Sequence, residues 1–154
     1  RGCWETVAGL DALLTAAADA DDPVRDPSID LVRRLDLLTG RAADGDARTL
    51  AALDRTAGWL GVGAGILVNL FDPELLVLGG YFARLGPWIA GPLAASLPDR
   101  VFAPAEGGCR VEPSSLGFTA AARGGALEAM GRIFDDPTAV ASPRAAAVPA
   151  GAPA

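Results

Sequence analysis

The longest regular pattern in the chain is an apolar stripe between residues 50 and 71. Apolar residues recur there at steps of three and four, which is the spacing of one face of an α-helix. The stripe consists of Leu50, Leu53, Ala57, Leu60, Ala64, Leu67 and Phe71. Asp72-Pro73 follows it, and a residue that precedes proline is disfavoured in helical geometry. We therefore expect one continuous, buried helix that ends at Asp72-Pro73.

A short apolar run follows this helix. Residues 75–78 read Leu-Leu-Val-Leu without polar alternation, which is typical of a strand buried on both faces. Gly79-Gly80 stands at its carboxyl end, and a weaker strand over 110–113 is expected at a sheet edge, because Pro113 lacks a ladder donor. The order of helix, buried strand and glycine pair predicts an α/β fold. Two strands cannot bury both faces of a parallel sheet, so the predicted sheet is incomplete.

Four further helices are predicted from apolar spacing. The first covers residues 6–18, and the second covers 29–38, with residues 26–28 as its N-cap region and Gly40 as its C-terminal stop. A third passes through Trp88, Ile89, Leu93 and Leu97 and should be distorted by Pro92. Thr119 is expected to cap the last helix, whose apolar residues are Leu127, Met130, Ile133 and Phe134.

Composition limits the classes of protein to consider. The chain has 154 residues, of which 51% are hydrophobic, and it should form one domain over 1–136 before a Pro- and Ala-rich, disordered tail over 137–154. The net charge of −6 without histidine argues against a nucleic-acid-binding surface within this segment. No apolar run is long enough to span a bilayer, and two distant cysteines favour no disulfide, so the cytoplasm is the expected compartment.

The first five residues, Arg-Gly-Cys-Trp-Glu, lack an initiating Met and indicate a fragment of a longer protein. A thiolate at Cys3 is a good zinc ligand, but a structural zinc site needs four ligands and the chain has no histidine and one other, distant cysteine. Taken alone, Cys3 is better explained as a small apolar residue. Glu5 fits either the positive start of a helix or a carboxylate that accepts hydrogen bonds from the hydroxyls of a polar ligand.

Glycines occur in two different settings. Four of them lie inside the long predicted helix, where a phosphate-binding loop is not expected, so close helix packing is the better explanation: Gly58, Gly61, Gly63 and Gly65. Asn69 on the same helix is interpreted as a satisfied amide. Gly79 and Gly80 follow a buried strand, where backbone amides can approach a phosphate, although a plain tight turn explains them equally well.

Three stretches together resemble the ROK family of repressors, open reading frames and sugar kinases. Residues 1–5 resemble the close of the family's zinc motif, Cys-x-Cys-Gly-x-x-Gly-Cys-x-Glu. Residues 61–80, with Asn69, Asp72-Pro73-Glu74 and Gly79-Gly80, resemble its long helix, turn, strand and glycine pair. Residues 115–126 resemble its closing strand and helix. The resemblance extends from residue 1 to about residue 137.

The resemblance implies a partial second lobe of an actin-like ATPase (ribonuclease H-like) fold. In that frame Cys3 is the last zinc ligand, Glu5 contacts sugar hydroxyls, and Gly79 and Gly80 lie on the nucleotide side in kinase members. The other zinc ligands, the catalytic Asp and the phosphate loop are expected upstream of residue 1. The chain alone should therefore not transfer phosphate, because that chemistry depends on groups from both lobes.

Three features resemble the regulator branch more than the kinase branch. Residues 5–9 depart from the Glu-x-Tyr-x-Ser-Gly usual in kinases, while residues 78–82 and residues 107–118 resemble regulators. The sequence thus favours the sugar-sensing lobe of a homodimeric transcriptional regulator, whose DNA-binding domain lies outside this chain. The alternative is the C-terminal lobe of an ATP- and Mg-dependent hexose kinase, similar to glucokinases.

Overall fold

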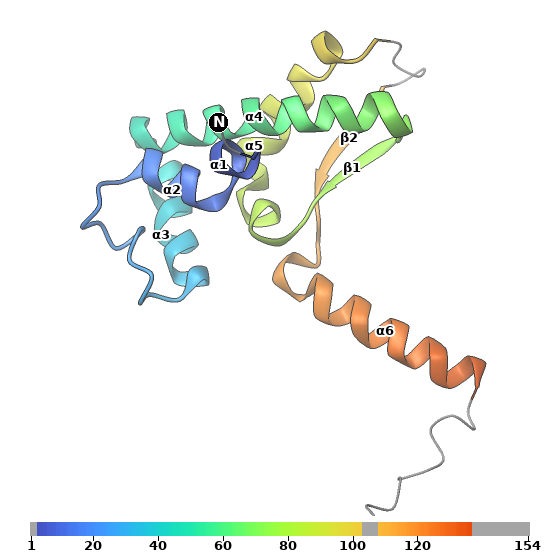
Figure 1. Ribbon diagram of the computed structural model, residues 1–154. Helices are drawn as coiled ribbons and strands as arrows, with labels where there is room; N and C mark the ends of the chain where they lie inside the picture. The colour runs from blue at the N-terminus through green and yellow to red at the C-terminus, as the bar shows by residue number, and fades with distance from the viewer. Residues whose placement is uncertain (1–2, 103–107, 137–154) are drawn as a thin grey trace, which may run out of the picture. The chain divides into compact units, whose positions relative to one another are not determined.

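The computed structural model describes residues 3–102 and 108–136, which divide into one unit up to Phe118 and a second from Thr119 (Figure 1). The element order contains six α-helices, two 3-10 turns and two strands within these residues. The elements are α1 (Glu5–Ala8), α2 (Leu10–Ala17), α3 (Leu31–Ala43), α4 (Ala47–Phe71), β1 (Leu75–Leu78), α5 (Gly80–Ser96), η1 (Pro98–Arg100), β2 (Arg110–Pro113), η2 (Gly117–Thr119) and α6 (Ala120–Asp135). The predicted α/β class is confirmed.

The long helix α4 is the element against which α1, α2, α3 and α5 pack (Figure 1). Its N-cap is Asp46, whose carboxylate accepts a hydrogen bond from the N–H of Thr49 at 2.8 Å. It ends at Phe71, and Asp72 adopts the left-handed conformation with φ 44°. The predicted helix and its end before Pro73 are therefore confirmed.

The predicted apolar stripe of α4 is correct only along the first part of the helix. Leu53, Ala57, Leu60 and Ala64 are buried, whereas Leu67 and Phe71 are 43% and 73% exposed. The buried face continues instead through Val68. The stripe turns because the buried side follows α5 and η1, and no other described element of the first unit covers the side of Leu67 and Phe71.

The single helix predicted over residues 6–18 is wrong, since the chain forms two helices that meet at Gly9. Gly9 is extended, with φ −77° and ψ 170°, and its N–H donates to the carbonyl of Glu5 at 2.8 Å. Helix α2 nevertheless buries Leu13, Leu14 and Ala17, which stand at the helical spacing from which a helix was predicted in this segment.

The helix predicted over residues 29–38 begins and ends later in the structure, as α3 over Leu31–Ala43. Helix α3 begins after Asp30, whose carboxylate accepts from the N–H of Val32 at 2.9 Å, whereas Asp26 forms a separate turn with Ser28. It continues through Gly40 to Ala43, so Gly40 is not a stop. Leu35, Leu38 and Ala42 are buried on both sides of Gly40, and this packing compensates for the low helix propensity of glycine.

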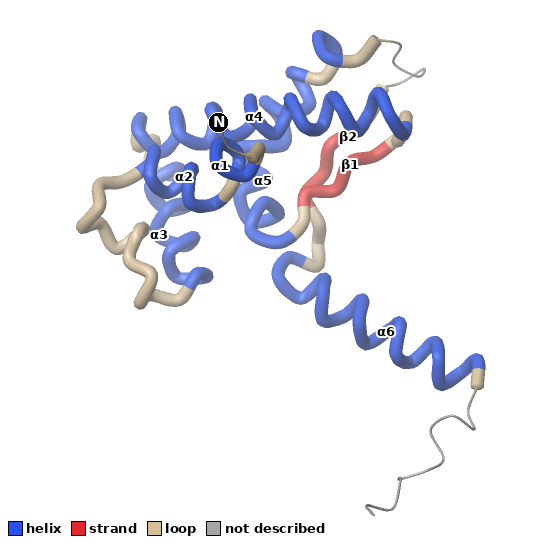
Figure 2. The backbone as a smooth tube through the Cα atoms, in the orientation of Figure 1, coloured by secondary structure: helices blue, strands red, loops and turns tan. Residues whose placement is uncertain are grey.

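The two strands form a parallel pair in which Leu75 lies opposite Arg110 and Leu78 lies opposite Pro113 (Figure 2). Helix α5 connects the strands and packs on one face of the pair. The prediction that the first strand is buried on both faces is wrong for the described residues, because Leu75 and Val77 are 37% and 57% exposed. The two predicted strands are confirmed, and the edge position of the second strand stays a prediction, because each strand has a single neighbour among the described residues.

Helix α5 runs from Gly80 to Ser96 through Pro87 and Pro92. The predicted core residues Ile89, Leu93 and Leu97 are buried, as is Leu85. Gly86 brings the helix close to the second strand, since a Cβ at this position would lie 2.6 Å from the Cβ of Pro113. The glycine therefore sets the separation between α5 and the sheet.

The second unit contains α6, which begins after Thr119. Thr119 has the predicted N-cap position, but its side chain makes no capping hydrogen bond. Its predicted core residues Leu127, Met130, Ile133 and Phe134 are exposed, and no residue of α6 is buried. Where the resemblance placed a closing strand near Ser115, the chain forms a 3-10 turn, and the strand lies earlier at 110–113. The predicted tail over 137–154 lies outside the described residues.

Candidate functional site

Cys3 and Glu5 lie at the start of α1, on the surface. The carbonyl of Cys3 accepts hydrogen bonds from the N–H and the hydroxyl of Thr6, at 3.0 and 2.7 Å. Glu5 occupies the first turn of α1 and is exposed, and its carboxylate makes no hydrogen bond or ion pair within the described residues. Its charge suits the positive end of the helix, and its oxygens are also accessible to a ligand.

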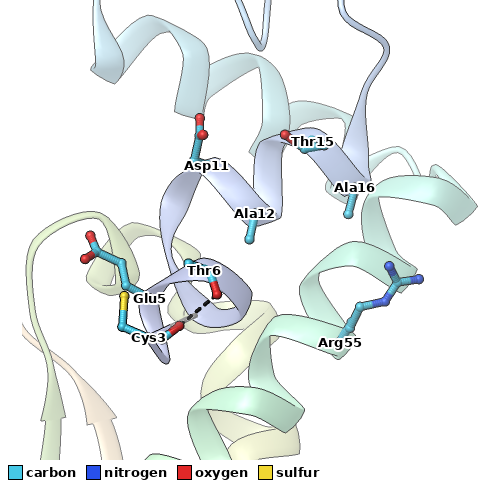
Figure 3. A pocket seen from close by; sticks show the side chains of 8 residues that line it. All are labelled: Cys3, Glu5, Thr6, Asp11, Ala12, Thr15, Ala16 and Arg55. Atoms are coloured by element: carbon cyan, nitrogen blue, oxygen red, sulfur yellow. Dashed lines mark hydrogen bonds between the residues drawn. The ribbon is translucent and has the colours of Figure 1, made fainter. Parts of the chain in front are cut away.

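An open groove of about 760 Å³ begins at these residues (Figure 3). It is formed by α1, α2 and one residue of α4. Its lining consists of Cys3, Glu5, Thr6, Asp11, Ala12, Thr15, Ala16 and Arg55. Ala12 and Ala16 point into the space between α2 and α4, and their small side chains leave room there (Figure 3).

The chemistry of this groove suits a neutral ligand with several hydroxyl groups. The carboxylates of Glu5 and Asp11 accept hydrogen bonds, and the guanidinium of Arg55 donates them. The hydroxyls of Thr6 and Thr15 add groups that can take either role. Arg55 makes no ion pair within the described residues, so its donors are available to a ligand.

A second, smaller cavity of about 280 Å³ shares Glu5 with the groove. Its other lining residues are Trp4, Ala8, Gly9, Leu60, Tyr81 and Phe82. The rings of Tyr81 and Phe82 have centroids 4.2 Å apart. Burial and the charge of Glu5 raise the pKa of Tyr81 above its usual value, although the N–H of Leu10 opposes them.

Gly9 is required for the position of Glu5. A Cβ on Gly9 would lie 2.9 Å from the Cγ of Glu5 and even closer to its carbonyl oxygen. The glycine thus permits the close turn that ends α1 one residue before α2 begins. Glu5 and the groove depend on this turn.

Gly79 and Gly80 lie at the turn between β1 and α5. Gly79 is the N-cap of α5, and Gly80 has a φ of +56°, which favours glycine. A Cβ on either residue would meet no atom within 4 Å, so the space above the turn is open. The next two residues, Tyr81 and Phe82, line the cavity that contains Glu5, which brings the two predicted sites to neighbouring positions.

A complete metal site is not formed by the described residues. Cys3 and Cys109 are free thiols, and no group of three potential ligands occurs among residues 3–102 and 108–136. A structural zinc site requires four ligands. The described residues alone therefore do not fit zinc, and Cys3 could supply one ligand at most.

The glycines of α4 have the packing role that the sequence indicated, with one exception. A Cβ on Gly65 would lie 2.8 Å from the Cβ of Arg100, and Gly61 and Gly63 face Ser96 and Trp4 at similarly short distances. Gly58 faces open space and serves no such purpose. Asn69 is a satisfied amide, as interpreted, because it bonds to the carbonyls of Gly65 and Arg100 at 2.8 Å.

Among the residues that line the groove and the adjoining cavity, the sequence identified only Cys3 and Glu5 as site residues, and three of those that it missed are Trp4, Arg55 and Tyr81. Trp4 lies between the two motif residues, Arg55 reaches the groove from α4, and Tyr81 follows the glycine pair. The position of Trp4 beside Glu5 was a usable signal. Arg55 and Tyr81 reach the site by tertiary contacts over some 50 to 75 residues of sequence, which no local pattern reveals.

The comparisons with known proteins give one family match and two related repressors. The sequence profile of the ROK family matches residues 1–131. The xylose repressor of Bacillus spizizenii is 30% identical over 124 residues, and that of Bacillus subtilis is 27% identical. Each alignment covers 80% of this chain and 30% of the repressor, so the chain spans about 30% of the length of these relatives.

Two solved structures share the fold. A ROK family glucokinase from Streptomyces griseus, solved with glucose and AMPPNP, superimposes with a TM-score of 0.60 over 78% of this chain and 42% of its own. A ROK family transcriptional regulator, a homologue of the Escherichia coli MLC protein, superimposes with a TM-score of 0.56 over 73% of this chain and 29% of its own. Both are 24% identical to this chain. The fold is thus part of the actin-like ATPase fold of kinases and regulators alike.

Among the described residues, no helix has the length and hydropathy that crossing a bilayer requires.

Proposed function

The chain belongs to the ROK family, and from this premise we propose that it is the sugar-sensing lobe of a cytoplasmic transcriptional regulator. The observation that carries the proposal is the accessible, unpaired carboxylate of Glu5 at the edge of a groove with further hydroxyl-binding groups. A carboxylate in this setting accepts hydrogen bonds from a monosaccharide. The curated relatives are xylose repressors, which favours regulation over catalysis and makes a pentose or hexose the candidate effector.

The proposal extends to the partners of the complete gene product. DNA would be bound by a domain outside this chain, because this chain itself has a net negative charge. The regulator would act as a homodimer. Cys3 would supply one thiolate of a zinc site completed by ligands outside the described residues. Sugar binding near Glu5 would favour one of two lobe arrangements, and that preference would alter DNA affinity.

A kinase is the second candidate, and the open turn at Gly79 and Gly80 supports it. The turn lies at the carboxyl end of β1, where α/β proteins bind ligands, and the space that a Cβ of either glycine would enter is open. In that case the chain would contribute the nucleotide side of an ATP- and Mg-dependent hexose kinase. The glucokinase in complex with glucose and AMPPNP has the same fold, which is compatible with both candidates.

Calorimetric titration of the complete gene product with D-xylose and D-glucose tests the sugar site. Glu5→Gln should weaken sugar binding at least about tenfold, because a hydrogen bond to a charged acceptor contributes roughly 1.5–3 kcal/mol. Asp21→Asn is the matched control, since Asp21 is exposed and lines neither cavity near Glu5. Equal affinities for the wild type and Glu5→Gln would refute the role of Glu5.

Two further measurements on the same preparation separate the candidates. A regulator should change its affinity for DNA from its own promoter when sugar is added, without consuming ATP. A sugar-dependent transfer of phosphate from ATP would instead establish the kinase. The zinc content of the preparation, compared with that of Cys3→Ser, tests the proposed ligand.

A further inference from the structure

Trp4 is the residue between Cys3 and Glu5, and its indole is bound to the long helix. Its Nε1–H donates to the carbonyl of Trp59 on α4 at 2.8 Å. Trp4 is nevertheless 47% exposed, so it is not an ordinary core residue. This contact joins the start of α1 to a helix 55 positions away in the sequence.

Gly63 provides the space that the indole occupies. A Cβ at this position would lie 2.7 Å from Cη2 and 2.8 Å from Cε2 of Trp4. Helical Cα–Cβ bonds lean toward the N-terminus, so a side chain at residue 63 would project over the turn that contains Trp59. The same missing side chain therefore makes room for the ring and exposes the carbonyl that its N–H reaches.

Helix α1 needs an external attachment, because it has only four residues. Forming a first helical turn is unfavourable by itself, so a helix of this length is not stable without tertiary contacts. Ala8 is its one buried residue, and Trp4 is its N-cap. The indole on Gly63 is thus a main constraint on where Glu5 stands.

We propose that Trp4, seated on Gly63, is a positioning residue that fixes Glu5 at the ligand groove and couples the groove to α4. The inference rests on the proposed function for its ligand, a monosaccharide, but the coupling itself does not require one. A shift of α4 along its axis would carry the indole and hence Glu5 with it. Conversely, a ligand held by Glu5 would stabilise this position of α4.

The test compares Gly63→Ala with Gly58→Ala in the complete gene product. Both replace a glycine within α4, but a Cβ at Gly58 meets no atom within 4 Å. Hydrogen exchange should show loss of protection at the α1 amides of Val7, Ala8 and Gly9 in Gly63→Ala and not in Gly58→Ala. Affinity for the sugar that binds the wild type should fall about tenfold in Gly63→Ala alone, as in Glu5→Gln, because a displaced carboxylate loses the same hydrogen bonds.

A double variant shows whether the effect passes through the indole. In a Trp4→Ala background, Gly63→Ala should cause no additional loss of protection or affinity, because the ring that it displaces is gone. Trp4→Phe, which lacks the Nε1 donor, should give an intermediate loss. Equal exchange at α1 in Gly63→Ala and Gly58→Ala would overturn the inference. Failure of the wild type to bind either sugar would refute the sugar site while leaving the exchange test decisive for the positioning role.

Discussion

Asp72 is held in a conformation that most side chains avoid. It is the only residue other than glycine with positive φ among the described residues, at φ 44° and ψ 52°. Its N–H donates to the carbonyl of Val68 at 2.8 Å and so closes α4. The carboxylate also stands at the negative end of the helix, which is electrostatically unfavourable. A single position therefore combines two small costs to stability.

Replacing Asp72 with glycine should stabilise the protein. The gain is expected to be about 1 kcal/mol in the free energy of unfolding, because glycine enters the left-handed region without a steric cost. Asp72→Asn should give a smaller gain, since asparagine removes the charge but keeps the Cβ. Denaturant titration of the three proteins measures both effects, and an unchanged or lower midpoint for Asp72→Gly would contradict this explanation.

At the scale of elements, an ion pair attaches the loop between α2 and α3 to helix α3. The two oxygens of Asp22 each lie 2.9 Å from a nitrogen of the Arg41 guanidinium on α3. The N–H of Val24 donates to the same carboxylate at 2.8 Å, and Val24 is fully buried. The ion pair thus holds a loop that inserts an apolar side chain into the core.

This contact should make stability depend on acid pH. The hydrogen bond from Arg41 lowers the pKa of Asp22 below its ordinary value of 3.8, against the effect of burial. The stabilisation is therefore fully present above about pH 4 and is lost as the pH falls through the lowered pKa. Asp22→Asn should cost about 1 kcal/mol at pH 7 and progressively less below pH 3.8.

Thermal unfolding of wild type and Asp22→Asn between pH 2 and pH 7 measures this difference. Asp21→Asn changes the neighbouring exposed carboxylate and should leave the pH dependence as it is in the wild type. A difference between wild type and Asp22→Asn that stays constant across the pH range would show that the ion pair is not its source.

The elements that were predictable are those whose signals are local. Asp46 and Asp72-Pro73 mark both ends of α4, and the apolar run before Gly79 marks β1. The break at Gly9 was not predictable, because it depends on packing of Glu5 and Trp4 against other elements. The continuation of α3 through Gly40 likewise depends on buried residues on either side.

The candidate site, like the elements, was predictable only where its residues stand in a local motif. Cys3 and Glu5 stand in a motif, and the exposed position of Glu5 agrees with a ligand-binding role. Arg55 and Tyr81 join the groove and the adjoining cavity from α4 and α5, and nothing beside them in the sequence indicates this. Sequence patterns thus locate groups along one segment, whereas the opposite wall of a cavity depends on the fold.

At the scale of the first unit, one face of the sheet and the end of α4 have no cover from the other described elements of that unit. The exposed apolar side chains include Ile66, Leu70 and Phe71 of α4 and Leu75 and Val77 of β1. Parallel strands are normally covered on both faces, and contiguous apolar surface promotes association. The 154-residue chain by itself should therefore be marginally stable and prone to associate.

Light scattering and binding of a hydrophobic dye test this expectation on the chain alone. Leu70→Lys with Val77→Lys should reduce both signals severalfold, because charge on the surface opposes association. Ala51→Lys with Gly58→Lys adds the same two charges on the exposed side of the first half of α4 and should change neither. A sharp, cooperative thermal transition of a monomeric wild-type chain would contradict the prediction.

The use of Asn69 has a consequence for how this lobe can recognise a ligand. Asn69 is the sole carboxamide side chain of the sequence, which contains no glutamine and no histidine. Its amide group bonds to the main chain on both sides, at the carbonyls of Gly65 and Arg100 and the N–H of Phe102. The groove therefore combines groups of fixed polarity, carboxylates that accept and a guanidinium that donates, with threonine hydroxyls. A ligand would be distinguished by where its hydroxyl groups stand relative to these fixed donors and acceptors, because a hydroxyl can turn its proton to suit either.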